Sequence, residues 1–158
     1  MLPDFISAKI MRQNYDGEVF PCMGCRSFLA PYKDPKTGKY KWYGRFNQGV
    51  VTLNLVDVGL SAEKDISQFW SILDERLELC YQALMLRHER LKGTPLNTSP
   101  IHWKYGALSR LKGDNFDELL YNGYSSISLG YAGLYECVVS LIGESHTTEK
   151  GQELALAI

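Results

Sequence analysis

The sequence predicts an α/β fold, and two apolar runs lead to this prediction. Residues 49–60 (GVVTLNLVDVGL) begin β-branched and apolar on nearly both faces, which is typical of a strand buried on both sides in a parallel sheet. Residues 125–134 (SSISLGYAGL) have the composition of a second buried strand, with glycines at a bend. A helical pattern follows each run, as in the alternating strands and helices of α/β proteins.

The first part of the chain predicts two smaller elements. Residues 8–15 (AKIMRQNY) show a short helical pattern, which Asp16–Gly17 is expected to end by turn chemistry. Residues 30–44 hold two prolines and two glycines among lysines and tyrosines, so we expect an exposed loop or hairpin there.

A long helix is predicted from Ser61 to Lys92. Ser61 is the expected N-cap, and Glu63 and Asp65 favour the positive first turn of the helix. The apolar positions recur as on one helix face: Ile66, Phe69, Leu73, Leu77, Cys80, Leu84 and Leu91. Gly93 is expected to end the helix. At about 1.5 Å per residue its length would exceed about 40 Å, so we expect it to line a large barrel or sheet.

The remaining residues predict shorter elements. Residues 94–100 are expected to form a loop, and residues 115–123 a short helix closed at Gly123. Residues 134–143 are expected to form the helix that follows the second strand. A last helix is expected to begin after Thr147 and Thr148, which stand at the N-cap, with Glu149 in its first turn.

Length, charge and composition limit the classes of protein. The chain has 158 residues, the size of one ordinary domain, and its 17 basic and 18 acidic residues give no support for a nucleic-acid or membrane surface built on bulk charge. The first residues lack a signal-peptide pattern, and no segment approaches 18 uninterrupted apolar residues. We therefore expect a soluble, cytoplasmic chain whose cysteines stay reduced.

Cys22 and Cys25 form a Cys-x-x-Cys motif that three kinds of site could use. A zinc site needs further ligands, and the sequence has no second motif of this spacing, so no metal site is expected. A thioredoxin-type pair should follow a strand and open a helix, whereas this motif leads into FLAPYKDPKTG. The third kind is one reactive thiol on a rigid loop tip, where Gly24 permits a tight bend beside Cys25.

Several blocks of the chain, in one order, resemble a known family. These blocks are PCMGCRSFL, GRFNQGVVTLNL, FWSILDERLELCYQALMLRH, SPIHWKYGALSRL, GYSSISLGYAGLYE and GESHTTEKG. They are similar to the catalytic region of anaerobic (class III) ribonucleoside-triphosphate reductases, and the resemblance covers almost the whole chain. It implies a glycyl-radical enzyme with a ten-stranded α/β barrel, in which a finger loop carries the cysteine that becomes a thiyl radical.

The resemblance also implies roles for three residues near the start of the chain. Cys25, in MGCR, matches the thiyl-radical cysteine. Met23 matches a methionine that accompanies members of the family using formate as the reductant. Asn47, in GRFNQG, matches the asparagine that hydrogen-bonds the ribose hydroxyls, with Asn54 as the second choice. Stabilisation of the turn before the strand is the alternative role of Asn47. A neutral amide can orient a hydroxyl without placing a charge in a dry site.

A second site is expected at the start of the last helix. Hydroxyl groups and free backbone N–H groups at a helix start can form an anion pocket suited to the phosphates of a nucleotide. Ser145, Thr147 and Thr148 are the candidate residues. Ordinary helix capping is the alternative role for the same side chains.

The chain also departs from the family. Asn54-Leu55-Val56-Asp57 stands where the family commonly continues with Pro-Arg, so that corner is expected to be rebuilt. The sequence contains no regulatory cone, no cysteine-rich zinc module and no glycyl-radical loop. Residues 1–158 are therefore interpreted as a partial catalytic barrel domain, with a finger loop near its N-terminus.

This interpretation implies several partners. They are a nucleoside triphosphate substrate, formate, the remaining segments of the reductase, and a radical S-adenosylmethionine activase with an iron-sulfur cluster. The resemblance also implies that the full enzyme is a homodimer. The activase would generate the glycyl radical, which lies outside this chain, as does the zinc of the full-length family. Two alternatives stay open: a catalytically silent product of a truncated or split gene, and a small dithiol redox protein using Cys22 and Cys25.

Overall fold

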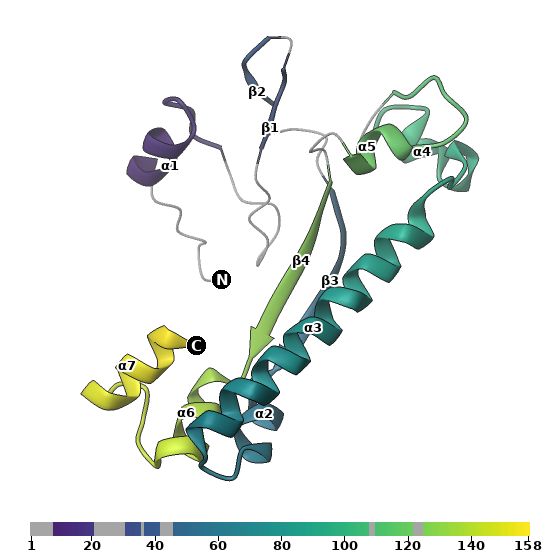
Figure 1. The fold of residues 1–158 in the computed structure, drawn as a ribbon. Coiled ribbons are helices and arrows are strands. Elements are labelled where there is room, and N and C mark those ends of the chain that lie inside the picture. The colour runs from purple at the N-terminus through teal and green to yellow at the C-terminus, as the bar shows by residue number, and fades with distance from the viewer. Residues whose placement is uncertain (1–7, 21–30, 36, 42–45, 108–109, 122–124) are drawn as a thin grey trace. The chain divides into compact units, whose positions relative to one another are not determined.

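The computed structural model describes residues 8–20, 31–35, 37–41, 46–107, 110–121 and 125–158 (Figure 1). The chain forms two compact units, residues 1–49 with 87–128 and residues 50–86 with 129–158. The first unit contains α1 (Ala8–Asn14), β1 (Tyr32–Lys33), β2 (Tyr40–Lys41), a 3-10 turn (Leu96–Thr98), α4 (Pro100–Trp103) and α5 (Asp117–Tyr121). The second contains α2 (Leu55–Ser61), α6 (Leu134–Ile142) and α7 (Glu149–Ala157). Three elements contribute residues to both units: β3 (Phe46–Asn54), α3 (Ile66–Leu91) and β4 (Ser125–Ala132).

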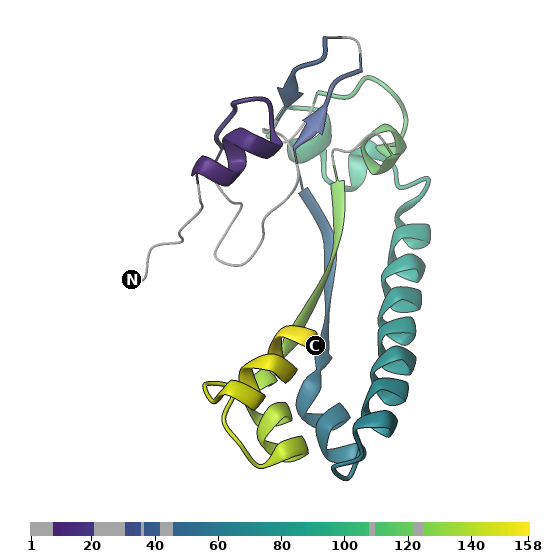
Figure 2. The ribbon, with the colours of Figure 1, turned by 60° about the vertical axis from the view of Figure 1, so that its left-hand side comes forward.

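Strands β3 and β4 form a two-stranded sheet, and Figure 2 shows that they run in the same direction. The order of strand and helix is the predicted one, because α2 follows β3 and α6 follows β4. The prediction of an α/β fold with parallel strands is therefore confirmed. The ten-stranded barrel and the finger loop stay predictions.

Strand β3 ends earlier in the sequence than predicted. Instead of continuing to residue 60, β3 ends at Asn54, whose side-chain oxygen accepts hydrogen bonds from the N–H groups of Val56 (3.1 Å) and Asp57 (3.4 Å). Asn54 thereby caps α2, whose Leu55 and Val58 are buried three residues apart. The prediction for residues 55–60 was wrong because a short apolar run fits a buried helix as well as a buried strand.

The long helix begins later than predicted, and Ser61 is not its N-cap. Ser61 is the last residue of α2, and the N-cap of α3 is Asp65, whose carboxylate accepts from the N–H groups of Ser67 (2.8 Å) and Gln68 (3.0 Å). Between the two helices Glu63 and Lys64 adopt positive φ angles of 48° and 68°, which no continuous helix contains. Gly93, with φ of 73°, follows the end of α3 as predicted.

The other elements agree closely with expectation. Helix α1 and the β1–β2 hairpin lie within the predicted ranges, and the described part of residues 115–123 contains α5, with Gly123 outside the described residues. The predicted loop at 94–100 is instead a 3-10 turn that leads into α4. Trp103 of α4 stacks on Phe116 with ring centroids 4.8 Å apart, so it has a packing role.

Each unit has its own apolar core. In the first unit one core cluster consists of the buried residues Leu96, Phe116 and Leu120, with Phe46, Leu91, Trp103 and Leu111 packed against them. In the second unit the core joins β3, α2, α3 and α6 through Leu53, Leu55, Val58, Ala62, Phe69, Leu73, Cys137 and Leu141. Gly59 lets α2 approach α6 closely, because a Cβ there would lie 3.1 Å from the Cα of Cys137. None of the described helices is long and apolar enough to cross a membrane.

Candidate functional site

Asn47 lies near the start of β3, half-buried, with its side chain held at both ends. Its Nδ2 donates a hydrogen bond to the hydroxyl of Ser128 on β4, and its Oδ1 accepts from the N–H of Gly49 at 2.8 Å. An amide side chain carries two N–H donors and two oxygen lone pairs. Within the described residues, these bonds use one of the two donors of Asn47 and one of its two acceptor positions.

The neighbouring residue, Gln48, is held from the opposite side. Its Oε1 lies 2.8 Å from Nδ1 of His88 on α3, and its Nε2 donates to the hydroxyl of Ser125 on β4 at 2.7 Å. Because the Gln48 oxygen can only accept, Nδ1 of His88 carries the proton. The ring of His88 also meets Tyr121 edge to face, with centroids 5.3 Å apart. Three elements are thus joined at Gln48.

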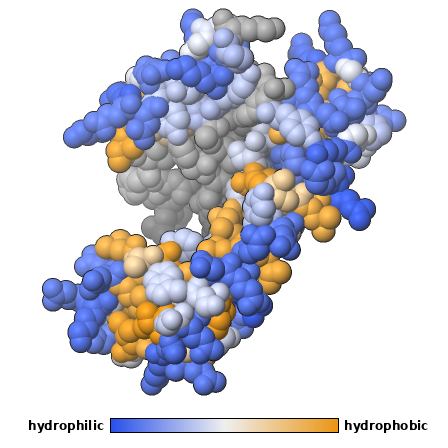
Figure 3. All heavy atoms as spheres, viewed as in Figure 1, coloured by the Kyte–Doolittle hydropathy of each residue, from blue (hydrophilic) through white to orange (hydrophobic). Residues whose placement is uncertain are grey.

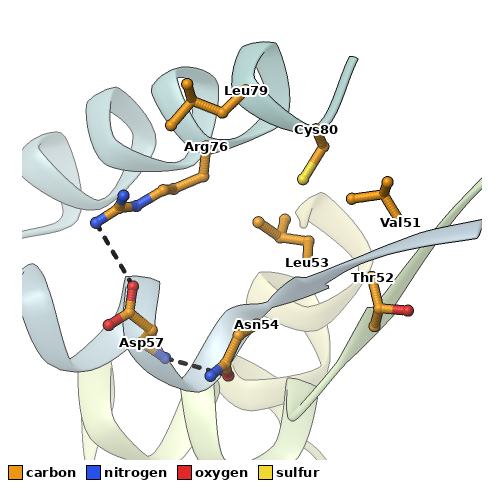
Figure 4. A pocket seen from close by; sticks show the side chains of 8 residues that line it. All are labelled: Val51, Thr52, Leu53, Asn54, Asp57, Arg76, Leu79 and Cys80. Carbon is orange, nitrogen blue, oxygen red and sulfur yellow. Dashed lines mark hydrogen bonds and ion pairs between the residues drawn. The ribbon is translucent and has the colours of Figure 1, made fainter. Parts of the chain in front are cut away.

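Asn54, the second choice for the ribose-binding asparagine, lies in surroundings that differ from those of Asn47. Its side-chain oxygen caps α2, as described above. It also lines a pocket between β3, α2 and α3, which Figure 4 shows from close by: Val51, Thr52, Leu53, Asn54, Asp57, Arg76, Leu79 and Cys80. In this pocket Arg76 reaches from α3 toward Asp57, with an Nη2 to Oδ2 distance of 3.6 Å. The oxygen of Asn54 is therefore used in helix capping, whereas Asn47 uses both ends of its amide and joins β3 to β4.

The loop before α7 brings the three candidate phosphate-binding residues together. Thr148 is the N-cap of α7: its hydroxyl accepts from the N–H of Gly151 at 3.2 Å and donates toward the Glu144 carboxylate and the Ser145 carbonyl, both at 2.9 Å. The hydroxyls of Ser145 and Thr147 bond to each other at 2.9 Å. Capping thus occupies Thr148, while Ser145 and Thr147 pair beside the helix start.

Cys22, Met23 and Cys25 lie outside the described residues. The described cysteines, Cys80 and Cys137, are free thiols. Cys137 is fully buried, and this burial raises the pKa of its thiol to about 11, because the charged thiolate is poorly solvated there. Within the described ranges no three histidine, cysteine, aspartate or glutamate side chains gather as metal ligands would.

Sequence reasoning missed four residues of this region: Gln48, His88, Ser125 and Ser128. Their signal was present in the strands, because GRFNQG and SSIS place polar side chains where a strand buried on both sides should be apolar. Buried polar groups require partners. A search for partners between the two strands could have paired these residues, but only the structure shows that His88, 40 residues after Gln48, joins them.

Comparisons with known proteins agree over the whole chain. A family model described as "Anaerobic ribonucleoside-triphosphate reductase" matches residues 1–158. Proteins of that name are 40% identical in Salmonella typhimurium and 39% identical in Escherichia coli, each over 100% of this chain and 22% of the relative. The protein of that name from Enterobacteria phage T4 is 44% identical over 86% of this chain and 24% of the relative. The chain thus spans about a fifth of the length of these relatives.

Proposed function

The chain belongs to the anaerobic ribonucleoside-triphosphate reductase family, and from this premise we propose that it is a segment of the catalytic region that reduces ribonucleoside triphosphates to deoxyribonucleoside triphosphates. The match over residues 1–158 carries this proposal. Since the chain spans about a fifth of its relatives, we propose that it acts together with the remaining segments of a reductase.

Asn47 is proposed to bind the hydroxyls of the substrate ribose. Its remaining N–H and its remaining lone pair could donate to one hydroxyl and accept from its neighbour. A neutral amide avoids the desolvation cost that a carboxylate or ammonium group would bring to a site closed to water. The support for this role is that both ends of the amide are fixed before any ligand binds, as positioned catalysis requires.

Cys25 is proposed to supply the reacting sulfur. The radical of the full enzyme would take the hydrogen atom of this thiol, and the resulting thiyl sulfur would have to lie almost in contact with C3′ of the ribose to take the hydrogen atom from that carbon. Water and oxidants must be excluded from such a site. Met23, two residues earlier, is proposed to accompany formate as the reductant.

The loop before α7 is proposed to bind the substrate phosphates. Ser145 and Thr147 would offer hydroxyl donors, together with N–H groups of the first turn of α7, which lack partners within the helix. Thr148 would fix the loop through its bonds to Glu144, Ser145 and Gly151. Gly151 is needed for this geometry, because a Cβ there would lie 1.9 Å from the Ser145 carbonyl oxygen.

The cofactors and partners follow from the family and belong to the proposal. We propose that a radical S-adenosylmethionine activase with an iron-sulfur cluster forms the glycyl radical on a segment outside this chain, in a cytoplasmic, homodimeric enzyme. We propose that the zinc ion of the full-length family is bound by segments outside this chain.

A chimeric reductase tests the proposed function. This chain replaces the matching segment of the Escherichia coli relative, and the chimera is expressed with a radical activase and assayed anaerobically for deoxynucleotide. We expect product from the chimera, and a loss of about 100-fold or more in kcat for Asn47→Ala, because the ribose hydroxyls would lose their fixed partner. Asn54→Ala is the matched control, which should affect the capping of α2 and leave the chemistry largely intact.

Two outcomes would contradict the proposal. A chimera that is folded and carries the glycyl radical but forms no deoxynucleotide would indicate a catalytically silent segment. Full activity of the Asn47→Ala chimera would remove Asn47 from its role while leaving the segment's function in place.

A further inference from the structure

The alternation of side chains along β3 is interrupted beside Asn47. Gln48 faces α3, because it bonds His88. Gly49 faces α3 as well, because a Cβ at this position would lie 2.1 Å from Nη1 and 2.6 Å from Cδ of Arg87. Two consecutive residues of β3 therefore face α3. Gly49 suits this place, since its φ of 156° is one that other residues rarely adopt.

The interruption separates two sets of contacts. Asn47 bonds Ser128, which lies three residues after Ser125 on β4, whereas Gln48 bonds Ser125 and, on α3, His88. The Gly49 N–H donates to Oδ1 of Asn47 at 2.8 Å. The backbone that carries Gln48 is therefore the backbone that sets the orientation of the Asn47 amide.

The hydrogen bonds at Gln48 form a directed chain. Nδ1–H of His88 donates to Oε1 of Gln48, Nε2–H of Gln48 donates to Oγ of Ser125, and the Ser125 hydroxyl lies 3.4 Å from the carbonyl oxygen of Leu120. Each group acts in a role that it can fill, so both ends of the Gln48 side chain are satisfied. The chain ties β3 to α3 and β4 at the one residue that separates Asn47 from Gly49.

We propose that Gln48 and His88 are positioning residues for the proposed reaction: the hydrogen bonds of Gln48 to His88 and to Ser125 hold this part of β3 and thereby fix the Asn47 amide against the ribose. The inference rests on the proposed function of Asn47. Gln48 on β3 and His88 on α3 would act through Asn47 and would not touch the substrate.

The first test measures turnover in the chimeric reductase. Gln48→Leu keeps the bulk of the side chain and removes both hydrogen bonds, so kcat should fall about 10- to 100-fold while KM changes less than about threefold, as for a catalytic group that is displaced rather than lost. Gln48→Glu should restore most of kcat, because a carboxylate accepts from His88 and from the Ser125 hydroxyl. His88→Phe keeps the ring against Tyr121 and should lower kcat in the same sense. Gln82→Leu, the same exchange at an exposed position of α3, is the control and should leave kcat unchanged.

The second test observes Asn47 directly and needs no turnover. In the 158-residue chain labelled with ¹⁵N at asparagine side chains, the Asn47 resonance is assigned by its absence in Asn47→Ala. Solvent exchange of its amide protons should be at least about threefold faster in Gln48→Leu than in the native chain, in Gln48→Glu and in Gln82→Leu, because loosening this part of β3 releases the amide from Ser128 and Gly49.

The outcomes separate this inference from the proposed function. If Asn47→Ala lowers kcat and Gln48→Leu does not, Asn47 keeps its role and the positioning role of Gln48 is wrong. Equal impairment of Gln48→Leu and Gln48→Glu, or equal amide exchange in all variants, would also overturn it. If Asn47→Ala is fully active, the proposed role of Asn47 itself fails.

Discussion

Two asparagines of one strand have different roles because the sequence that follows each of them differs. Asn47 and Asn54 both lie on β3, and both accept a hydrogen bond from an N–H two residues later, at Gly49 and Val56. After Asn54 the chain turns into α2, so its side chain becomes a helix cap. After Asn47 the strand continues through Gly49, so part of the amide stays available. The resemblance named Asn47 first, whereas its partners Gly49 and Ser128 came from the structure.

Cys137 gives a prediction at the scale of one side chain. The pKa of its thiol is about 11, compared with an ordinary value of 9.0, because burial disfavours the thiolate. The thiolate is the reactive form, so at pH 8 the native thiol should be alkylated about 100-fold more slowly than the same cysteine in urea, and its rate should rise with pH until about 11. Peptide mapping of iodoacetamide-treated chain measures this rate.

Cys80 is the control for that experiment. It is only partly buried, so its protection in the native chain should be much smaller. Equal alkylation rates of Cys137 in the native and the unfolded chain would show that its burial on the face of α6 that packs against α2 is wrong.

At the scale of elements, the sequence predicted types better than boundaries. The long periodic pattern of α3 and the glycine after it were sufficient to predict that helix and its end. The junction between α2 and α3 was missed because Ser61, Glu63 and Asp65 all suit a helix start, and local preference does not choose among them. Glu63 and Lys64 have positive φ angles, which interrupt the helix just before Asp65. Asp65 is therefore the N-cap of α3.

The N-cap of α3 can be tested by substitution. Asp65→Ala should lower the free energy of unfolding by about 1 kcal/mol, because the N–H groups of Ser67 and Gln68 lose their acceptor. Ser61→Ala should change it by less than about 0.5 kcal/mol. Urea titrations followed by circular dichroism measure both. If Ser61→Ala lowered the free energy of unfolding more than Asp65→Ala, the N-cap at Asp65 would be wrong and the predicted single helix beginning at Ser61 would be correct.

At the scale of the whole molecule, the described sheet is small for a parallel one. Parallel strands occur almost only in larger sheets that are covered on both faces, whereas β3 and β4 form a sheet of two. Apolar side chains are also exposed, among them Leu129 at 50% on β4 and Leu156 at 81% on α7, and Figure 3 shows apolar surface over α6 and α7. These features fit a segment that adds to further strands and helices, as the proposed function requires.

The sequence predicted the class of fold, most elements and the family, because these depend on patterns spread along many residues. The arrangement around Gln48 could not be predicted in the same way. It depends on a contact between His88 and a strand residue 40 positions earlier, and on a backbone conformation that Gly49 permits. Such long-range polar contacts leave no period in the sequence.

One measurement tests most directly the claim that this chain supplies the reacting sulfur of a reductase. In the chimeric enzyme with its activase, deoxynucleotide formation and the electron paramagnetic resonance of the glycyl radical are recorded for the native segment and for Cys25→Ala. We predict that Cys25→Ala abolishes product and leaves the radical signal in place, because the radical is stored elsewhere and only its transfer to the sugar needs the sulfur. Continued product formation by Cys25→Ala would contradict the claim.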